Sequence, residues 1–134
     1  MSEQTPRRVA VWIDHHAAII ATFIGERLKQ EEELLPDLNL QDHGRGWTQR
    51  RIEAHHHEQW KHFCEEIVEH MGSVDEILIV GPGQAKHELR RQIEHHKGLR
   101  GKVLALQTAS RMTENELVAH AEAFYGLEME KELT

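Results

Sequence analysis

The stretch DEILIVGPG, residues 75–83, decides the fold class. Its four consecutive apolar residues, enclosed by an aspartate and a Gly-Pro-Gly turn, are typical of a strand covered on both faces, as in a parallel sheet. Val103 to Leu106 form a second run of this kind, which we expect to be another buried strand. Between the two runs, apolar residues recur at helical spacing from Gln84 to His96. The order strand, helix, strand predicts a crossover connection and an α/β fold with parallel neighbouring strands.

The sequence before this unit predicts three further strands. Residues alternate with a period of two from Arg8 to Asp14, which indicates a strand with one face on the core. Asp14-His15-His16 interrupts the pattern and Ala17 to Ile24 resumes it, so we expect an antiparallel hairpin. Arg27 to Leu35 is mostly polar and suits a solvated edge strand, although a helix is an alternative for this segment.

Two more helices complete the pattern. Pro36 to Thr48 has no periodicity and is predicted to be a loop, after which Gln49 to His70 forms an amphipathic helix ended by Gly72. The residues Thr113 to Glu116 form a capping box for a last helix, which Gly126 can end. A three-strand meander followed by two strand-helix units predicts an α/β fold: a ribonuclease-H-like mixed sheet with about three helices, formed by residues 1–134 as a single domain.

The composition of the chain excludes some classes of function. The chain has 134 residues, one cysteine (Cys64) and no apolar run of the roughly 18 residues that a membrane helix needs, which together favour a cytoplasmic protein without disulfides or membrane contact. Sixteen Lys and Arg against 23 Asp and Glu give a formal net charge of −7, which excludes a protein that coats nucleic acid through bulk positive charge. Any contact with nucleic acid must therefore be local.

Two segments are candidates for such a contact. The first is a glycine-flanked loop and the start of the following helix, where guanidinium groups could meet phosphates while an indole stacks on a base. The second is a basic strip after the Gly81-Pro82-Gly83 turn, whose helix-start N–H groups could receive a phosphate. The candidate nucleic-acid-binding residues are His43, Gly44, Arg45, Gly46, Trp47, Arg50 and Arg51 in the first segment and Lys86, Arg90, Arg91 and Lys97 in the second.

Other reactive residues favour structural roles. None of the 12 histidines has a partner four residues along the chain, so we predict no metal site and no cofactor, with solvated histidines that could contact RNA when protonated. Asp14, at the end of the first strand, is a candidate ligand for a ribonuclease-H-like metal site. The later strands, however, end in Gly-Pro-Gly and in Gln107-Thr108 and supply no further carboxylates. This favours the interpretation that Asp14 is an aspartate of a hairpin turn. Cys64 lies on the apolar stripe of its helix and is predicted to be a packing residue.

The tetrapeptide His43-Gly44-Arg45-Gly46 carries a family resemblance. Between a strand meander and a long helix, it resembles the HGRGGQ loop in the middle domain of eukaryotic and archaeal class-1 peptide-release factors. A weaker similarity covers Val9 to Asp14, Asp75 to Gly83 and Gly101 to Leu106. The chain looks like a bacterial single-domain relative of release factors and Pelota-type rescue proteins. The resemblance implies a role in translation.

The departure from this family limits what the resemblance implies. The loop continues with Trp47-Thr48-Gln49, so the Gly-Gly-Gln triplet that positions the hydrolytic water in release factors is absent, and no hydrolytic role passes to Gln49. We also expect no stop-codon recognition, since 134 residues leave no room for the other release-factor domains. Our hypothesis is a non-enzymatic factor that binds the ribosome or tRNA, on stalled or idle ribosomes.

Three alternatives remain. Two are enzymatic: peptidyl-tRNA hydrolysis through Gln49 and metal-dependent RNA cleavage at Asp14. The third is an oligomerising structural module without nucleic acid, such as a homodimer in which the acidic C-terminal segment of one copy pairs with the basic strip of another. The acidic residues of that segment are Glu114, Glu116, Glu122, Glu128, Glu130 and Glu132.

Overall fold

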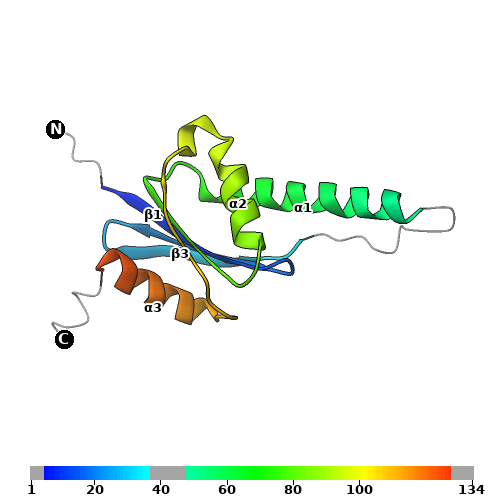
Figure 1. Ribbon diagram of the computed structural model, residues 1–134. Helices are drawn as coiled ribbons and strands as arrows, with labels where there is room; N and C mark the ends of the chain where they lie inside the picture. Colours follow the sequence, from blue (N-terminus) through cyan, green and yellow to red (C-terminus); the bar gives the residue numbers. More distant parts are fainter. Residues whose placement is uncertain (1–4, 37–47, 128–134) are drawn as a thin grey trace.

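The computed structural model describes residues 5–36 and 48–127, which form a five-stranded sheet and three α-helices (Figure 1). The strands are β1 (Arg7–Ile13), β2 (Ala18–Ile24), β3 (Arg27–Leu34), β4 (Glu76–Val80) and β5 (Val103–Gln107). The helices are α1 (Gln49–Met71), α2 (Ala85–Glu94) and α3 (Glu114–Tyr125), with the short 3-10 helix η2 (Lys97–Leu99) after α2. Within these described ranges, no helix is both long and apolar enough to cross a membrane.

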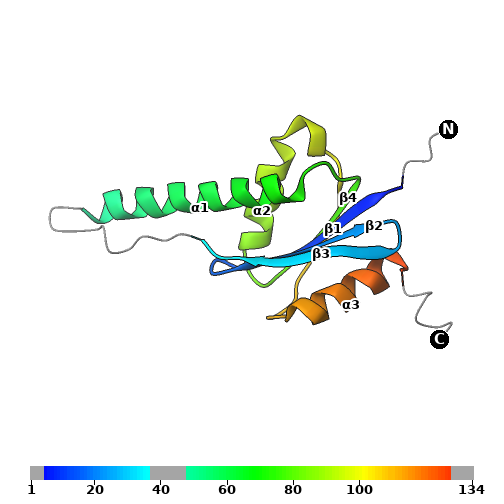
Figure 2. The ribbon, with the colours of Figure 1, turned by 180° about the vertical axis from the view of Figure 1, so that it is seen from behind.

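The sheet has the strand order β3-β2-β1-β4-β5. β1, β2 and β3 pair in antiparallel fashion, whereas β4 lies parallel to β1 and β5 parallel to β4. The predicted mixed sheet of ribonuclease-H-like topology is therefore confirmed. The segment from Arg27 is a strand and not the alternative helix, and it forms one edge of the sheet (Figure 2). Its charged residues discourage further strand pairing at this edge.

The β1–β2 hairpin is closed by the side chain of Asp14. Its Oδ1 accepts hydrogen bonds from the backbone N–H groups of His16 at 2.7 Å and Ala17 at 2.8 Å. Such Asx turns reverse the chain without help from tertiary contacts. The prediction of a hairpin-turn aspartate is confirmed.

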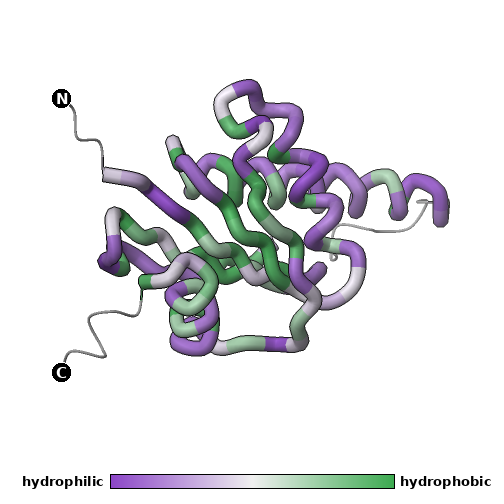
Figure 3. Tube along the Cα trace, turned by 60° about the vertical axis from the view of Figure 1, so that its left-hand side comes forward, coloured by the Kyte–Doolittle hydropathy of each residue, from purple (hydrophilic) through white to green (hydrophobic). Residues whose placement is uncertain are grey.

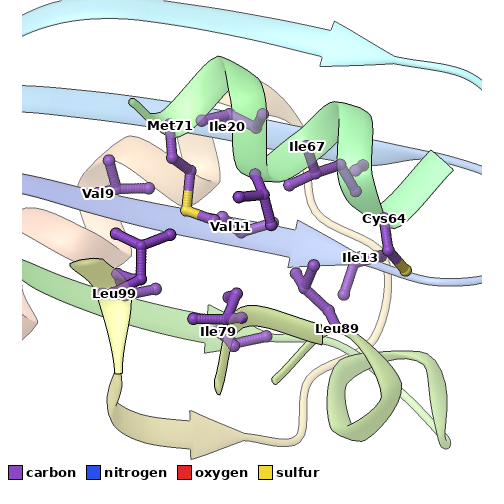
Figure 4. Close-up of a cluster of buried hydrophobic side chains, with 14 of the residues drawn as sticks. Val9, Val11, Ile13, Ile20, Cys64, Ile67, Met71, Ile79, Leu89 and Leu99 are labelled. Atoms are coloured by element: carbon purple, nitrogen blue, oxygen red, sulfur yellow. The ribbon is translucent and has the colours of Figure 1, made fainter. Parts of the chain in front are cut away.

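Helices cover both faces of the sheet (Figures 1 and 2). α1 and α2 pack on one face, where their apolar side chains meet Val9, Val11 and Ile13 of β1 (Figure 4). α3 packs on the other face against Ala10 and Trp12 of the same strand. Because successive side chains of a strand point to opposite faces, β1 supplies both layers of the core.

Two expectations about strand burial are wrong. β1 was expected to have one face on the core, but Ala10 and Trp12 on its other face are also fully buried, because α3 covers them. Val103 to Leu106 was expected to be buried, but β5 is the last strand of the sheet, and Leu104 is 51% exposed. An apolar run alone does not reveal whether a strand has a neighbour on each side.

Local signals determine where the helices begin and end. The Thr48 hydroxyl accepts a hydrogen bond from the backbone N–H of Arg51 at the start of α1, and Gly72, with φ of 66°, ends that helix as predicted. At α3 the predicted capping box between Thr113 and Glu116 is present. The helix boundaries therefore follow from side-chain chemistry close to each end.

The glycine at the end of β4 has a steric role. A β-carbon at Gly81 would lie 2.1 Å from the carbonyl oxygen of Ile13, which is much closer than a van der Waals contact. The backbone of Gly81 also donates a hydrogen bond to Gln107 O and accepts one from Ala109 N. The Gly-Pro-Gly turn therefore allows three chain segments to meet at this end of the sheet.

Candidate nucleic-acid interface

The long helix α1 consists of a packed half and a projecting half. At about 1.5 Å per residue its 23 residues span about 35 Å. Its buried side chains all belong to the C-terminal half: Phe63, Cys64, Ile67, Val68 and Met71. The N-terminal half extends beyond the ends of the strands and is largely hydrophilic (Figures 1 and 3). The fold thus presents a polar helical arm that the core does not need.

The structure places the predicted arginines of this arm at its tip. Arg50 and Arg51 lie in the first turn of α1, and both are exposed. The loop residues predicted with them, His43, Gly44, Arg45, Gly46 and Trp47, lie outside the described residues. Of the first candidate segment, the structure therefore describes only the two arginines on the helix.

The predicted basic strip is only partly exposed. Arg90 and Arg91 of α2 and Lys97 of η2 are exposed cations. Lys86 is 5% exposed and its Nζ donates a hydrogen bond to Gly83 O at 2.6 Å, so its inclusion in an exposed strip is corrected. The ammonium group satisfies the backbone of the preceding turn, and the alkyl stem packs inside the protein.

A groove of about 250 Å³ lies between α1 and α2. We call it the α1–α2 groove and define it by its lining residues: His57, Trp60, Lys61 and Cys64 from α1, and Glu88, Arg91, Gln92 and His95 from α2. On each helix these residues are spaced by three or four positions, so one face of each helix forms one wall. The groove brings Arg91 of the predicted strip to the same site as Lys61.

Hydrogen bonds engage the two carboxylates at the groove. His15 Nε2 lies 3.1 Å from Glu88 Oε1. Glu65, next to the lining residue Cys64, accepts a hydrogen bond from Gln92 and lies 3.3 Å from His96 Nε2. Among the described residues, Lys61 and Arg91 have no ion-pair or hydrogen-bond partner. The groove therefore holds two available cations in a protein whose overall charge is negative.

Aromatic contacts hold the indole of Trp60 in place. The His15 ring packs on it with a centroid distance of 4.6 Å, and the Phe63 ring lies 5.6 Å away, both in tilted geometry. Trp60 is half-buried and lines the groove. Its ring is a rigid apolar surface beside the two cations.

Cys64 is a packing residue, as predicted. It is 2% exposed, and burial, reinforced by the nearby Glu88 and Glu65, raises the pKa of its thiol from 9.0 to about 12. The thiol is consequently protonated at neutral pH and is a poor nucleophile. Cys64 contributes apolar contact at the base of the groove.

The residues of the enzymatic alternatives are occupied by structural contacts. The Gln49 side chain, at the first position of α1, donates a hydrogen bond to Glu53 Oε2 at 3.3 Å. Asp14 closes its hairpin through Oδ1. Within residues 5–36 and 48–127, no group of three or more His, Cys, Asp or Glu side chains could hold a metal ion.

Lys61 and the position of Trp60 at the groove were not predicted from the sequence. Neither residue was singled out as a binding residue, because the packing of α2 across α1 is not visible in the local pattern of α1. A signal was present in the spacing of His57, Lys61 and Cys64, which places them on one helical face with Trp60. His57 and His95, predicted to be solvated, line the two walls of the groove.

Comparisons with known proteins relate the fold to translation factors. No family model and no curated protein match the sequence. Among solved structures, the archaeal translation termination factor aRF1 matches 95% of this chain with 18% sequence identity and a TM-score of 0.55. Pelota of Archaeoglobus fulgidus matches 96% with 11% identity and a TM-score of 0.59, and Pelota of Thermoplasma acidophilum matches 92% with 17% identity and a TM-score of 0.57.

These matches cover nearly all of this chain but only 34–42% of the three larger proteins. At such low identity the similarity concerns the fold, which this chain shares with one part of each protein. The resemblance to release factors and Pelota expected from the HGRG tetrapeptide and the order of elements is confirmed at the level of structure.

Proposed function

We propose that this chain is a translation-associated factor that binds the ribosome or tRNA without catalysing a reaction. The observation that carries the proposal is the similarity of fold over 95% of the chain to a translation termination factor. The projecting half of α1, with Arg50 and Arg51 in its first turn, supplies exposed cations for phosphate contacts.

Three observations favour binding over hydrolysis. The sequence lacks the Gly-Gly-Gln triplet, and Gln49 is hydrogen-bonded to Glu53 within the helix. The Asp14 carboxylate serves the β1–β2 turn. We therefore expect no release of peptide from ribosomes loaded with peptidyl-tRNA. Peptide release that is abolished in Gln49→Ala would contradict the non-catalytic part of the proposal.

Cosedimentation with ribosomes through a sucrose cushion at physiological salt tests the binding. The wild-type protein is expected in the ribosome pellet, and the double variant Arg50→Ala/Arg51→Ala is expected largely in the supernatant. The matched control is Arg27→Ala/Lys29→Ala, which removes the same charge from exposed positions on the edge strand β3. Absence of the wild-type protein from the pellet would reject the proposal.

The state of the ribosome is tested in the same assay. Ribosomes stalled on a truncated message, vacant ribosomes and actively translating ribosomes are compared at equal concentration. We propose that the protein prefers stalled or vacant ribosomes, because a factor that enters the tRNA-binding region competes with bound tRNA. Equal pelleting with all three preparations would exclude this preference.

A further inference from the structure

We propose that the α1–α2 groove binds one nucleotide of a single-stranded RNA, with the base against Trp60 and a backbone phosphate between Lys61 and Arg91. The inference names a contact for the function proposed above and rests on that function for its biological setting. The groove is separate from the arginines at the tip of α1, and its residues Trp60 and Lys61 were not among the candidates predicted from the sequence.

Trp60 supplies the surface for a base. Its ring lines the groove and is in contact with the rings of His15 and Phe63, so it does not have to be ordered when a ligand binds. Stacking of a base on an aromatic side chain tolerates any sequence, because every base has a π-face. A rigid, half-buried indole is suited to this contact.

Lys61 and Arg91 supply the charge for a phosphate. They come from opposite walls of the groove, and neither has a partner among the described residues, whereas Glu88 is engaged by His15 and Glu65 by Gln92 and His96. An anion that enters the groove therefore meets two available cations.

The dimensions favour a strand of RNA over a free small molecule. The groove volume of about 250 Å³ suits one planar base and lies below the roughly 300–1,000 Å³ of pockets that enclose drug-sized ligands. Cations continue beyond the groove in both directions: Arg50 lies on the same face of α1, near its tip and beyond Glu53, and Arg90 and Lys97 follow on α2 and η2. A strand could contact these cations, which a mononucleotide could not reach.

Fluorescence polarisation with a labelled six-nucleotide polyadenylate and the purified protein tests the inference. Trp60→Ala is expected to weaken binding about 5- to 150-fold, the range for removal of one stacked base, while Trp60→Phe retains most of the affinity. Lys61→Gln and Arg91→Gln are each expected to weaken binding and to lower the slope of its salt dependence by about 0.7 for each phosphate that is no longer bound. The control Lys29→Gln removes one exposed charge on β3 and is expected to bind like the wild type.

Several results would overturn the inference. Lys61 and Arg91 lie at the surface of their helices, so their glutamine variants are expected to fold even if Trp60→Ala does not. Wild-type affinity in both glutamine variants would exclude the groove, and so would absence of binding by the wild type. Adenosine monophosphate that binds as tightly as the oligonucleotide would exclude a strand as the ligand.

Ribosome cosedimentation of the same variants separates this inference from the proposed function. If the wild type pellets with ribosomes but the groove variants bind the oligonucleotide normally, the groove assignment fails and the proposed function stands. If the groove variants no longer bind the oligonucleotide but the wild type does not pellet with ribosomes, the proposed function fails and the groove remains an RNA site.

Discussion

From Phe63 to Met71, α1 buries five side chains against the sheet and α2, whereas from Gln49 to Gln59 it buries none. The two halves of this helix therefore have different structural roles. The packed half fixes the helix axis, and the projecting half carries Arg50 and Arg51 away from the core (Figures 1 and 3). Stability and binding are thus assigned to different residues of one element, and substitutions in the two halves are expected to separate them.

The largest expected effect comes from the packed half. Phe63→Ala removes a fully buried ring from the cluster between α1 and the sheet, and is expected to lower the free energy of unfolding by about 3–5 kcal/mol. Urea denaturation followed by circular dichroism measures the change. A decrease below about 1 kcal/mol would show that α1 is not anchored at this position.

A pH series tests whether the Cys64 thiol in the packed half is shielded from water. The pKa of the Cys64 thiol is raised from 9.0 to about 12, so above pH 9 the unfolded chain releases a proton that the folded protein keeps. Stability is then present in full below pH 9 and falls as the pH rises toward 12, with a slope of at most about 1.4 kcal/mol per pH unit from this group. Burial also raises the pKa of Tyr125, which acts in the same direction.

The variant Cys64→Ala isolates the thiol in this series. It retains the contribution of Tyr125 and lacks that of Cys64, so its stability is expected to fall less steeply between about pH 9 and about pH 10.5. Urea denaturation at several pH values in this interval gives both slopes. Equal slopes for the two proteins would mean that the Cys64 thiol is not desolvated by the packing of α1.

A smaller effect is expected at the helix cap of the projecting half. Thr48→Ala removes the acceptor for the Arg51 N–H. In a helix that packs on the core, such a change lowers the free energy of unfolding by about 1 kcal/mol. Because the first turns of α1 have no buried side chains, we expect the change to appear as faster amide hydrogen exchange in those turns, with little change in global stability.

Thr113→Ala is the matched control, because α3 begins with the same kind of cap and packs on the sheet. There a decrease of about 1 kcal/mol is expected in the free energy of global unfolding. Equal effects of the two substitutions on global unfolding would mean that the projecting half of α1 folds and unfolds with the core.

The sequence predicts those parts of this molecule that depend on local patterns. The order of elements along the chain follows from the periodicities, the parallel pairing of β4 with β5 follows from the crossover rule, and the α3 cap follows from Thr113 and Glu116. The burial of Ala10 and Trp12 and the exposure of Leu104 were not predicted, because they depend on which strands have neighbours and which face α3 covers. Local patterns contain no such information.

The candidate site was predicted less completely than the fold, for the same physical reason. Lys86 was chosen for its charge, but its ammonium group turns back to Gly83 O. Lys61 and Trp60 acquire a possible role only because α2 packs across α1 and places Arg91 opposite them. Such a groove is a product of helix packing, whereas exposed arginines at a helix start, such as Arg50, can be identified from the sequence.

The smallest effect on stability and a large effect on binding are expected together at Arg50. This exposed side chain in the first turn of α1 contributes nothing to the core, so Arg50→Ala should change the free energy of unfolding by no more than about 0.5 kcal/mol. If the arm binds ribosomal phosphates, the variant binds one phosphate fewer, and its cosedimentation with ribosomes weakens and becomes less sensitive to salt. Met71→Ala, which removes a fully buried side chain of the packed half that does not line the α1–α2 groove, should show the opposite pattern of lowered stability and retained binding under conditions in which it is folded. A decrease of both properties in either variant would mean that the two halves of α1 act as one unit, because binding would then depend on the packing of the helix as a whole.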